Sequence, residues 1–305
     1  MSPSSRKFVR NLSSERRREA IAGYLFILPN LMGFLLFVLG PVIAALVLGF
    51  VEWDMRSSGE FVGLANYRKL AFEDEYFWKY VLNTLFLMLG IPIGMAGSLL
   101  LALVLNQKIR GRVFFRTIYF LPTMCAGVAI YFLWLWLLDA DFGLVNQLLV
   151  HLRLPRIGWL TTVRWAKPSL ILMGLWTGVG GFNMILYLAA LQNVPKHLYE
   201  AAEIDGAGRW RKFWAVTWPY LTPTTFFISI MSIIGGLQGG FEMAYIMTKG
   251  GPLGSTTTIN YYLFKNIYDY ARFGYAASIA WVLFLMVFVF TLLNWRLGGR
   301  LVSYD

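Results

Sequence analysis

The sequence is poor in the residues from which metal centres, disulfide frameworks and most enzyme active sites are built. It contains one cysteine, Cys125, and two histidines among 305 residues, and only 14% of its residues are charged. A single cysteine excludes an intrachain disulfide, and neither His151 nor His197 has a second metal ligand near it in the chain. The phosphate-binding loop of ATPases, GxxxxGK followed by Ser or Thr, is also absent. We therefore expect a protein that is not an enzyme and that needs no cofactor or metal.

Long apolar runs are what the chain has instead. Hydrophobic residues make up 58% of it and its mean hydropathy is +0.58, which is too apolar for an ordinary soluble domain. Six charge-free runs each exceed the roughly 20 residues that cross about 30 Å of hydrocarbon as a helix. These runs are residues 21–51, 80–107, 117–138, 168–195, 213–241 and 273–295. They predict an all-α polytopic membrane protein with six transmembrane helices and both termini on one side.

Positive charge sets the predicted orientation of these helices. Sixteen of the 27 Lys and Arg residues lie in four segments that we place inside the cell, residues 1–20, 108–116, 196–212 and 296–305. Because Lys and Arg are enriched in cytoplasmic loops, we expect cytoplasmic N and C termini. The net charge of +11 then reflects loops beside anionic lipid, not a nucleic-acid surface. We expect residues 1–20 to form a mobile, basic cytoplasmic tail.

A polar insert in the apolar second half of the chain, residues 200–219, predicts a docking element on the cytoplasmic side. Its sequence is EAAEIDGAGRWRKFWAVTWP. Asn193 can cap a helix and Pro195 can occupy the first turn of that helix, which would run to about Asp205. Gly206 would then end the helix, because glycine tolerates a positive φ.

The side chains of this predicted helix suit contact with another protein. Ala201 and Ala202 add no bulk, so the backbone of a partner can approach closely. Glu200, Glu203 and Asp205 offer negative charge to an Arg or Lys of the partner. The alternative, which involves no protein partner, is an amphipathic helix that lies on the bilayer surface.

Several motifs along the chain resemble those of one family. The insert has the spacing Glu-Ala-Ala, three residues, Gly, nine residues, an aliphatic residue, one residue, an apolar residue and Pro, with Trp218 at a position where the family usually has Leu. FVGLANYRKL at residues 61–70, Asn83-Thr84 and Phe115-Arg116 match further family strings. Thr-x-Gly-Gly-Pro at residues 248–252 is typical of the carbohydrate branch. The chain thus resembles the permease subunits of binding-protein-dependent ABC importers of sugars.

This resemblance implies a fold, a set of partners and a set of functional residues. The fold is the type I ABC importer permease (MetI-like) fold, which would occupy residues 21–305 and carry its coupling loop at about residues 193–218. The partners are a second homologous permease in a heterodimer, a dimer of cytoplasmic ABC ATPases, an extracytoplasmic solute-binding protein, the sugar and membrane lipid. The residues that couple to the ATPase would be Glu200, Ala201, Ala202, Asp205, Gly206 and Ala207.

Two glycine-rich strings inside predicted spans are candidates for the transport pathway. They are GVGGFN at residues 178–183 and GGLQGGFE at residues 235–242. Such glycines either permit close helix packing or expose backbone groups to a water-filled route. Polar neighbours favour the route, because polar groups in a membrane need water or a partner. The candidates for contact with substrate are Asn183, Ser232, Gln238 and Glu242.

Two other functions stay open at the level of sequence. An ion-coupled secondary transporter of small solutes would need carboxylates within the membrane, and Glu242, at the end of the fifth predicted span, is the only acid that we assign to a span. A membrane-embedded enzyme would need a catalytic constellation, and Asp139 and Asp141 have no histidine or nucleophile close in sequence. We interpret these two acids as loop residues.

Overall fold

The computed structural model describes residues 3–56 and 58–298, with side chains from Arg17 onward except that of Leu297. Its only strands in that part are β1 (Val51–Glu52) and β2 (Glu60–Phe61), an antiparallel pair in which Val51 faces Phe61. The helices up to the middle of the chain are α1 (Pro3–Phe34), α2 (Gly40–Leu48), α3 (Ala65–Arg68), α4 (Glu75–Leu87), α5 (Gly90–Leu105), α6 (Arg112–Met124), α7 (Gly127–Leu137) and α8 (Leu144–His151). The others are α9 (Val163–Gly178), α10 (Phe182–Gln192), α11 (Lys196–Ile204), α12 (Arg209–Lys212), α13 (Trp218–Gln238), α14 (Phe241–Met243), α15 (Ile259–Tyr268) and α16 (Phe273–Gly298). Four π-helical turns join neighbouring helices: η1 (Leu35–Leu39), η2 (Lys69–Glu73), η3 (Phe213–Thr217) and η4 (Ala244–Thr248).

The described part of the chain contains four unbroken helical segments that are long and apolar enough to cross a membrane. They are Arg17–Leu48, Glu75–Leu105, Arg209–Gln238 and Phe273–Arg296. Two further apolar helix pairs are broken, α6 with α7 by a bend of 98° and α9 with α10 by a bend of 43°. The predicted all-α membrane fold is confirmed, and the predicted number of six is reached only if each bent pair crosses as one span.

Each bend has a local cause. Pro122 lies in the last turn of α6, and Cys125 behind it is extended with φ −75° and ψ 148°, so the helix cannot continue. Gly180 separates α9 from α10, and a Cβ there would stand 2.2 Å from the carbonyl oxygen of Tyr119 in α6. The second bend therefore depends on a glycine that lets α6 come into backbone contact.

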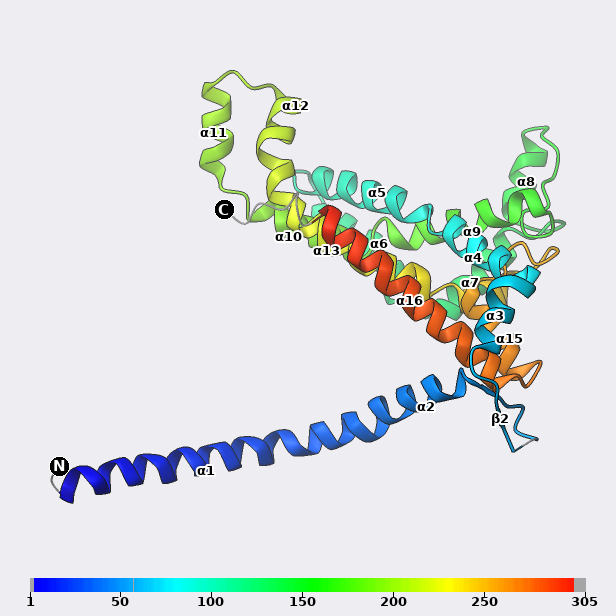
Figure 1. The fold of residues 1–305 in the computed structure, drawn as a ribbon. Coiled ribbons are helices and arrows are strands. Elements are labelled where there is room, and N and C mark those ends of the chain that lie inside the picture. Colours follow the sequence, from blue (N-terminus) through cyan, green and yellow to red (C-terminus); the bar gives the residue numbers. More distant parts are fainter. Residues whose placement is uncertain (1–2, 57, 299–305) are drawn as a thin grey trace.

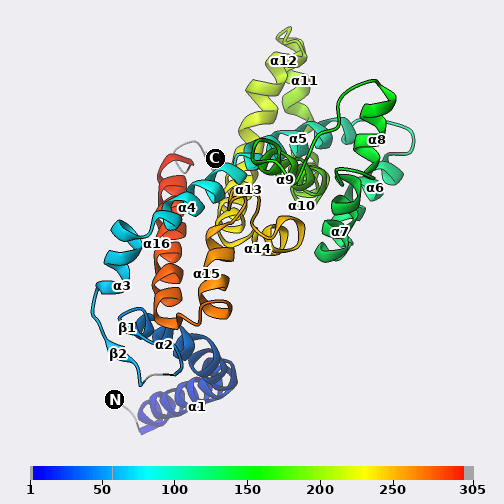
Figure 2. The ribbon, with the colours of Figure 1, turned by 90° about the vertical axis from the view of Figure 1, so that its right-hand side faces the viewer.

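The first span stands apart from the rest of the molecule in both views (Figures 1 and 2). None of its most apolar window is buried, and only α2 at its far end packs on α16. Residues 3–20, expected as a mobile tail, instead continue the helix. Arg, Glu and Ala are good helix formers, and adding residues to an existing helix avoids the cost of nucleation.

Residues of the family-like strings tie neighbouring elements together. Asn66 donates to the carbonyl oxygens of Gly49 and Val51 at 3.1 Å each, and so ties α3 to the end of the first span. The buried hydroxyl of Thr84 accepts the backbone N–H of Ile259 at 3.0 Å, which joins α4 to α15. These motif residues therefore act as scaffold.

Asp74 joins three helices at the same place. One carboxylate oxygen caps α4 by accepting the N–H groups of Tyr76 and Phe77, at 2.9 and 3.2 Å. The other oxygen accepts the hydroxyls of Tyr262 in α15 and Tyr275 in α16. Burial, and then the bond to Asp74, raise the pKa of the Tyr262 hydroxyl, so that it stays a proton donor.

The elements between spans gather at two opposite ends of the molecule. Helices α11 and α12 lie at one end, where α16 also finishes, and α3, α8 and α15 lie at the other (Figure 1). Below, the first is called the α11 end and the second the α15 end. Between them, α5 packs on α9 and α10, and α13 packs on α10 and α16.

Candidate functional site

The predicted docking helix exists as α11, with a different start from the one expected. Pro195 is its N-cap residue, with φ −63° and ψ 131°, and no side chain caps the first turn. Asn193, predicted as the cap, instead follows the C-terminus of α10, and its N–H donates to the carbonyl oxygen of Ala190 at 3.2 Å. The prediction for Asn193 was wrong because Pro195 already has the extended conformation that a helix entry needs.

The end of α11 is as predicted. Gly206 has φ +73°, its N–H donates to the carbonyl oxygen of Glu203 at 3.0 Å, and the Ala207 N–H donates to that of Ala202 at 2.9 Å. This pair of bonds is the Schellman motif, which satisfies the last carbonyl groups of a helix. No atom lies within 4 Å of where a Cβ on Gly206 would stand, so the requirement for glycine is conformational and not steric.

The predicted contact residues lie on an accessible surface. Glu200, Ala201 and Asp205 are exposed, and Ala202 and Ala207 are half-buried at the helix end. Sequence reasoning missed Ile204, whose side chain is 87% exposed although it is aliphatic. An exposed isoleucine between carboxylates, at the end of the molecule, gives α11 an apolar centre with a negative border.

Helix α12 and the turn η3 brace α11 through one side-chain contact each. The Lys212 ammonium lies 2.5 Å from the Glu203 carboxylate, and the hydroxyls of Tyr199 and Thr217 are 2.9 Å apart. Glu203 was predicted to face a partner, but in this chain its carboxylate already has a cation. The two contacts make α11 and the start of the next span a single unit that can move together.

A cavity of about 310 Å³ lies among α5, α9, α10 and α13. Two of the predicted pathway residues line it, Asn183 in the first turn of α10 and Ser232 in α13. The remaining lining is apolar or glycine, so these amide and hydroxyl groups are its polar side chains. Such a cavity, mostly apolar with a few polar groups, is typical of small-molecule sites.

The other two predicted pathway residues do not line this cavity. Gln238 is exposed at the end of α13, and its backbone carbonyl oxygen accepts a hydrogen bond from the side-chain amide of Asn260. Glu242 is exposed in α14, and its carboxylate faces α7, 3.5 Å from where a Cβ on Gly127 would stand. The four candidates therefore form two separate groups.

Met243 connects these regions and was not found from sequence. It lines the 310 Å³ cavity, a second of about 290 Å³ beside α7 and a third of about 140 Å³ beside α4. Nothing about a methionine in an apolar run signals such a position, because the three cavities meet only after the helices pack.

Glycines make the main cavity possible. Gly90 and Gly94 on α5 face Gly174 and Gly178 on α9, and all four line it. Each pair has the GxxxG spacing of close helix contacts, a signal that sequence reasoning also missed. Gly180, by contrast, serves packing against α6. In the glycine-rich strings, Gly180 therefore serves close packing and Gly178 lines the cavity, whereas their part in a transport route stays a prediction.

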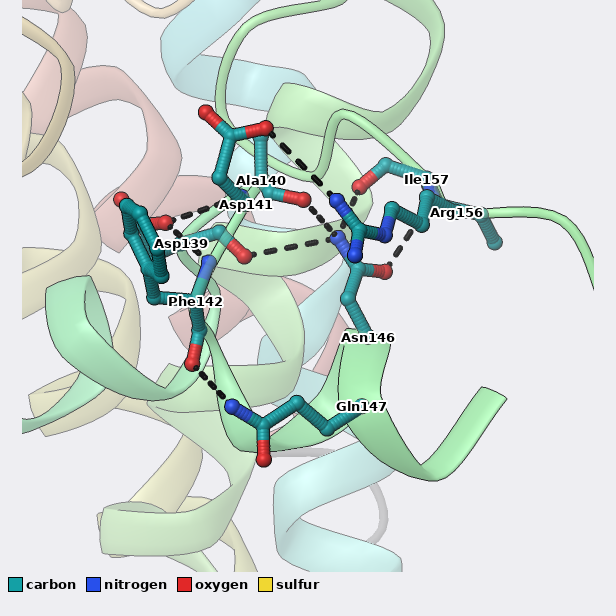
Figure 3. Close-up of polar contacts among 8 residues, drawn as sticks. All are labelled: Asp139, Ala140, Asp141, Phe142, Asn146, Gln147, Arg156 and Ile157. Carbon is teal, nitrogen blue, oxygen red and sulfur yellow. Dashed lines mark hydrogen bonds and ion pairs between the residues drawn. The ribbon is translucent and has the colours of Figure 1, made fainter. Parts of the chain in front are cut away.

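The acids Asp139 and Asp141 belong to a hairpin, residues 139–159, that contains α8 and lies at the α15 end (Figure 1). Figure 3 shows its polar contacts. Asp139 accepts the backbone N–H groups of Asp141 and Phe142 at 2.9 and 2.8 Å, which holds the pKa of its carboxyl below the ordinary value. Asp141 is 3.9 Å from Arg156. Within residues 3–56 and 58–298, no three His, Cys, Asp or Glu side chains gather as metal ligands.

The comparisons with known proteins agree with this arrangement. Residues 87–301 match the family of binding-protein-dependent transport system inner membrane components. The chain is 37% identical to the lactose transport system permease protein LacF of Rhizobium radiobacter, over 92% of this chain and 95% of the relative. It is 34% identical to a probable ABC transporter permease, YesP, of Bacillus subtilis, over 95% and 94%.

A solved structure is similar along nearly the whole chain. It is a bacterial alginate ABC transporter in complex with a periplasmic protein that holds an alginate pentasaccharide, at 27% identity and a TM-score of 0.83, covering 95% of this chain and 98% of that one. The chain therefore belongs to the family of binding-protein-dependent transport system inner membrane components, the permease subunits of ABC importers.

Proposed function

We propose that this permease forms half of the membrane pathway of a carbohydrate importer, and that α11 couples the pathway to a cytoplasmic ATPase dimer. The observation that carries the proposal is the exposed, Schellman-ended helix α11 at one end of the molecule. The partner across the membrane pathway is a second, homologous permease in a heterodimer.

Coupling begins at the exposed surface of α11. Glu200 and Asp205 bind basic residues of the ATPase, while Ala201 permits close approach and Ile204 enters an apolar pocket. Gly206 fixes the angle at which α11 meets α12. Since Lys212 and Tyr199 join α11 to the next span, a displacement of α11 by the ATPase moves that span as well.

The sugar passes through the cavities that meet at Met243. The amide of Asn183 and the hydroxyl of Ser232 offer hydrogen bonds to sugar hydroxyls. Gln238 and Glu242 offer further hydrogen bonds at the helix break between α13 and α14. The sugar class is supported by the names of the relatives, which include lactose, arabinooligosaccharide and trehalose/maltose transport permeases.

The α11 end faces the cytoplasm in this proposal, in the inner membrane of a bacterium or archaeon. Residues 1–20 are then a basic cytoplasmic segment beside anionic head groups, and residues 21–305 form the transmembrane domain. The α15 end faces outward, toward a solute-binding protein that delivers the sugar. Family membership argues against the ion-coupled secondary transporter considered from sequence.

Uptake into proteoliposomes tests the proposal. The chain is reconstituted with its second permease, the ATPase and the solute-binding protein, and entry of a radiolabelled oligosaccharide is followed. We expect uptake only when ATP is on the side of the membrane that carries the ATPase and the solute-binding protein is on the opposite side. Uptake that follows a sodium or proton gradient without ATP would contradict the proposal.

A further inference from the structure

A tight turn at the α15 end carries a residue that does not suit it. The N–H of Ser255 donates to the carbonyl oxygen of Pro252 at 2.9 Å, and both central residues have positive φ, +51° at Leu253 and +70° at Gly254. Positive φ at both positions is the pattern of a type I′ turn, in which Asn, Asp or Gly is favoured at the first of them. A leucine there is uncommon because its side chain crowds the backbone.

The turn is held in place from α4. The Lys79 ammonium donates to the carbonyl oxygen of Leu253 at 2.7 Å, and the Asn83 amide donates to that of Gly254 at 2.9 Å. The hydroxyl of Thr256 also donates to the carbonyl oxygen of Gly251 at 2.8 Å. The backbone that carries Leu253 is therefore fixed on both sides.

The clamped turn exposes one side chain only. The five residues that follow Gly254, from Ser255 to Ile259, are all buried, whereas Leu253 is 84% exposed. Packing within this chain does not explain a leucine there, because its side chain points to solvent. The many exposed leucines along the spans are covered by lipid, but this turn lies with α3, α8 and α15 at an end of the molecule (Figure 1).

The charges near the turn indicate the kind of partner. The Lys79 ammonium binds the turn itself, and Lys249 comes shortly before the turn in the sequence; neither forms an ion pair with any residue that the structure describes. A rigid apolar tip with an ammonium group held at its backbone is complementary to an apolar pocket with an acidic border. A lipid tail would not suit it, since the turn belongs to the polar end beyond the spans.

We propose that Leu253 is a docking contact for the extracytoplasmic solute-binding protein, and that it enters an apolar pocket with an acidic border on that protein. The inference rests on the proposed function and on the outward orientation of the α15 end. Because the backbone at Leu253 is already fixed, docking costs little conformational entropy. The same leucine on a mobile loop would bind more weakly, since the loop would have to become ordered. The contact, and not the turn, then accounts for a leucine at this position.

Substitution of Leu253 by Asn separates docking from folding. Asn suits a type I′ turn, so the thermal midpoint of the purified importer should stay the same or rise. The complete importer is placed in nanodiscs, and its ATP hydrolysis is titrated with the solute-binding protein that stimulates the wild type. We expect Leu253→Asn and Leu253→Asp to raise the half-saturating concentration by about tenfold or more, as loss of an anchor residue does, with basal hydrolysis unchanged.

Leu64→Asn is the matched control, because Leu64 is a 68% exposed leucine at the start of α3, at the same end. It should leave the half-saturating concentration at the wild-type value. Wild-type titration curves for both Leu253 variants would overturn the inference alone. Loss of the second permease on purification of either variant would also overturn it, in favour of a contact between permeases. Absence of stimulation in the wild type would contradict the proposed function itself.

Discussion

The Lys212 ammonium lies 2.5 Å from the Glu203 carboxylate and fastens α12 to α11. A surface ion pair contributes no more than about 1 kcal/mol to the free energy of unfolding. Its role is therefore to hold α11 and α12 in a fixed relative position. We expect Lys212→Ala to leave the folded yield unchanged and to lower sugar uptake per ATP hydrolysed, because α11 is less firmly tied to the span. The ratio of uptake to hydrolysis in proteoliposomes measures this.

Exchange of the two charges is the control for that prediction. Glu203→Lys combined with Lys212→Glu should restore part of the ratio that either single change lowers, since the attraction is rebuilt in reverse. If the double variant is worse than both single variants, Glu203 acts on the ATPase directly and the brace is not its role.

Alanine substitutions at Gly174, in α9, and at Gly180, in the bend after α9, should have opposite effects. Gly180→Ala would place a Cβ 2.2 Å from the Tyr119 carbonyl oxygen, so we expect loss of folded protein, by several kcal/mol of stability. Gly174→Ala meets no atom within 4 Å, and its added methyl group enters the cavity. It should fold normally and transport larger sugars more slowly. Size-exclusion yield and uptake of a mono- and a trisaccharide test both, and equal behaviour of the two variants would refute the cavity assignment.

Asn146 holds the hairpin of Figure 3 together. Its buried amide donates to the carbonyl oxygens of Ala140 and Ile157 at 2.9 Å each and accepts the N–H of Ile157 and the indole N–H of Trp159. Asn146→Leu leaves these groups unpaired, at about 1–3 kcal/mol for each buried one. We expect rapid tryptic cleavage in this hairpin while the spans stay folded.

The neighbouring Gln147 provides the comparison. It is exposed, and its side chain makes one hydrogen bond, to the carbonyl oxygen of Phe142 at 3.0 Å. Gln147→Leu should therefore be cleaved as slowly as the wild type. Cleavage of the Asn146 variant at the wild-type rate would mean that the hairpin does not depend on this amide.

Orientation can be tested with single cysteines in a Cys125→Ser background. Cysteines at Lys108 and Arg209 should resist a membrane-impermeant thiol reagent in intact cells and react after lysis, because we place both positions inside. A cysteine at Leu64, on the opposite face, should react in intact cells. The reverse pattern would invert the proposed topology.

The local features of the fold follow from sequence more readily than its tertiary ones. The end of α11 at Gly206 was predictable because a helix that must stop in a polar loop uses a residue tolerant of positive φ. The bends at Cys125 and Gly180 were not, since an uninterrupted apolar run looks the same whether straight or bent. Pro122 was the one available hint for the first bend.

The candidate pathway residues could be chosen from the sequence, but their arrangement could not be predicted from it. Asn183 and Ser232 are about fifty residues apart in sequence, and only the packing of α10 beside α13 brings them to one cavity. Gln238 is the last residue of α13, and Glu242 follows the helix break, where Gly240 has φ +79° and redirects the chain; neither residue lines that cavity. Polarity identified all four residues, but polarity carries no information on where a break redirects a side chain.

The most direct test of coupling through α11 compares two glycines of one loop. Gly206 has φ +73° and Gly208 has φ −67°, and neither would meet a neighbour with its added side chain. Gly206→Val should cost about 1–3 kcal/mol in local strain and misdirect α11, whereas Gly208→Val keeps an allowed backbone. Co-purification of the ATPase and sugar uptake are measured for both. We predict that Gly206→Val inserts in the membrane and loses both together while Gly208→Val retains them; wild-type ATPase binding and uptake in Gly206→Val would contradict the account.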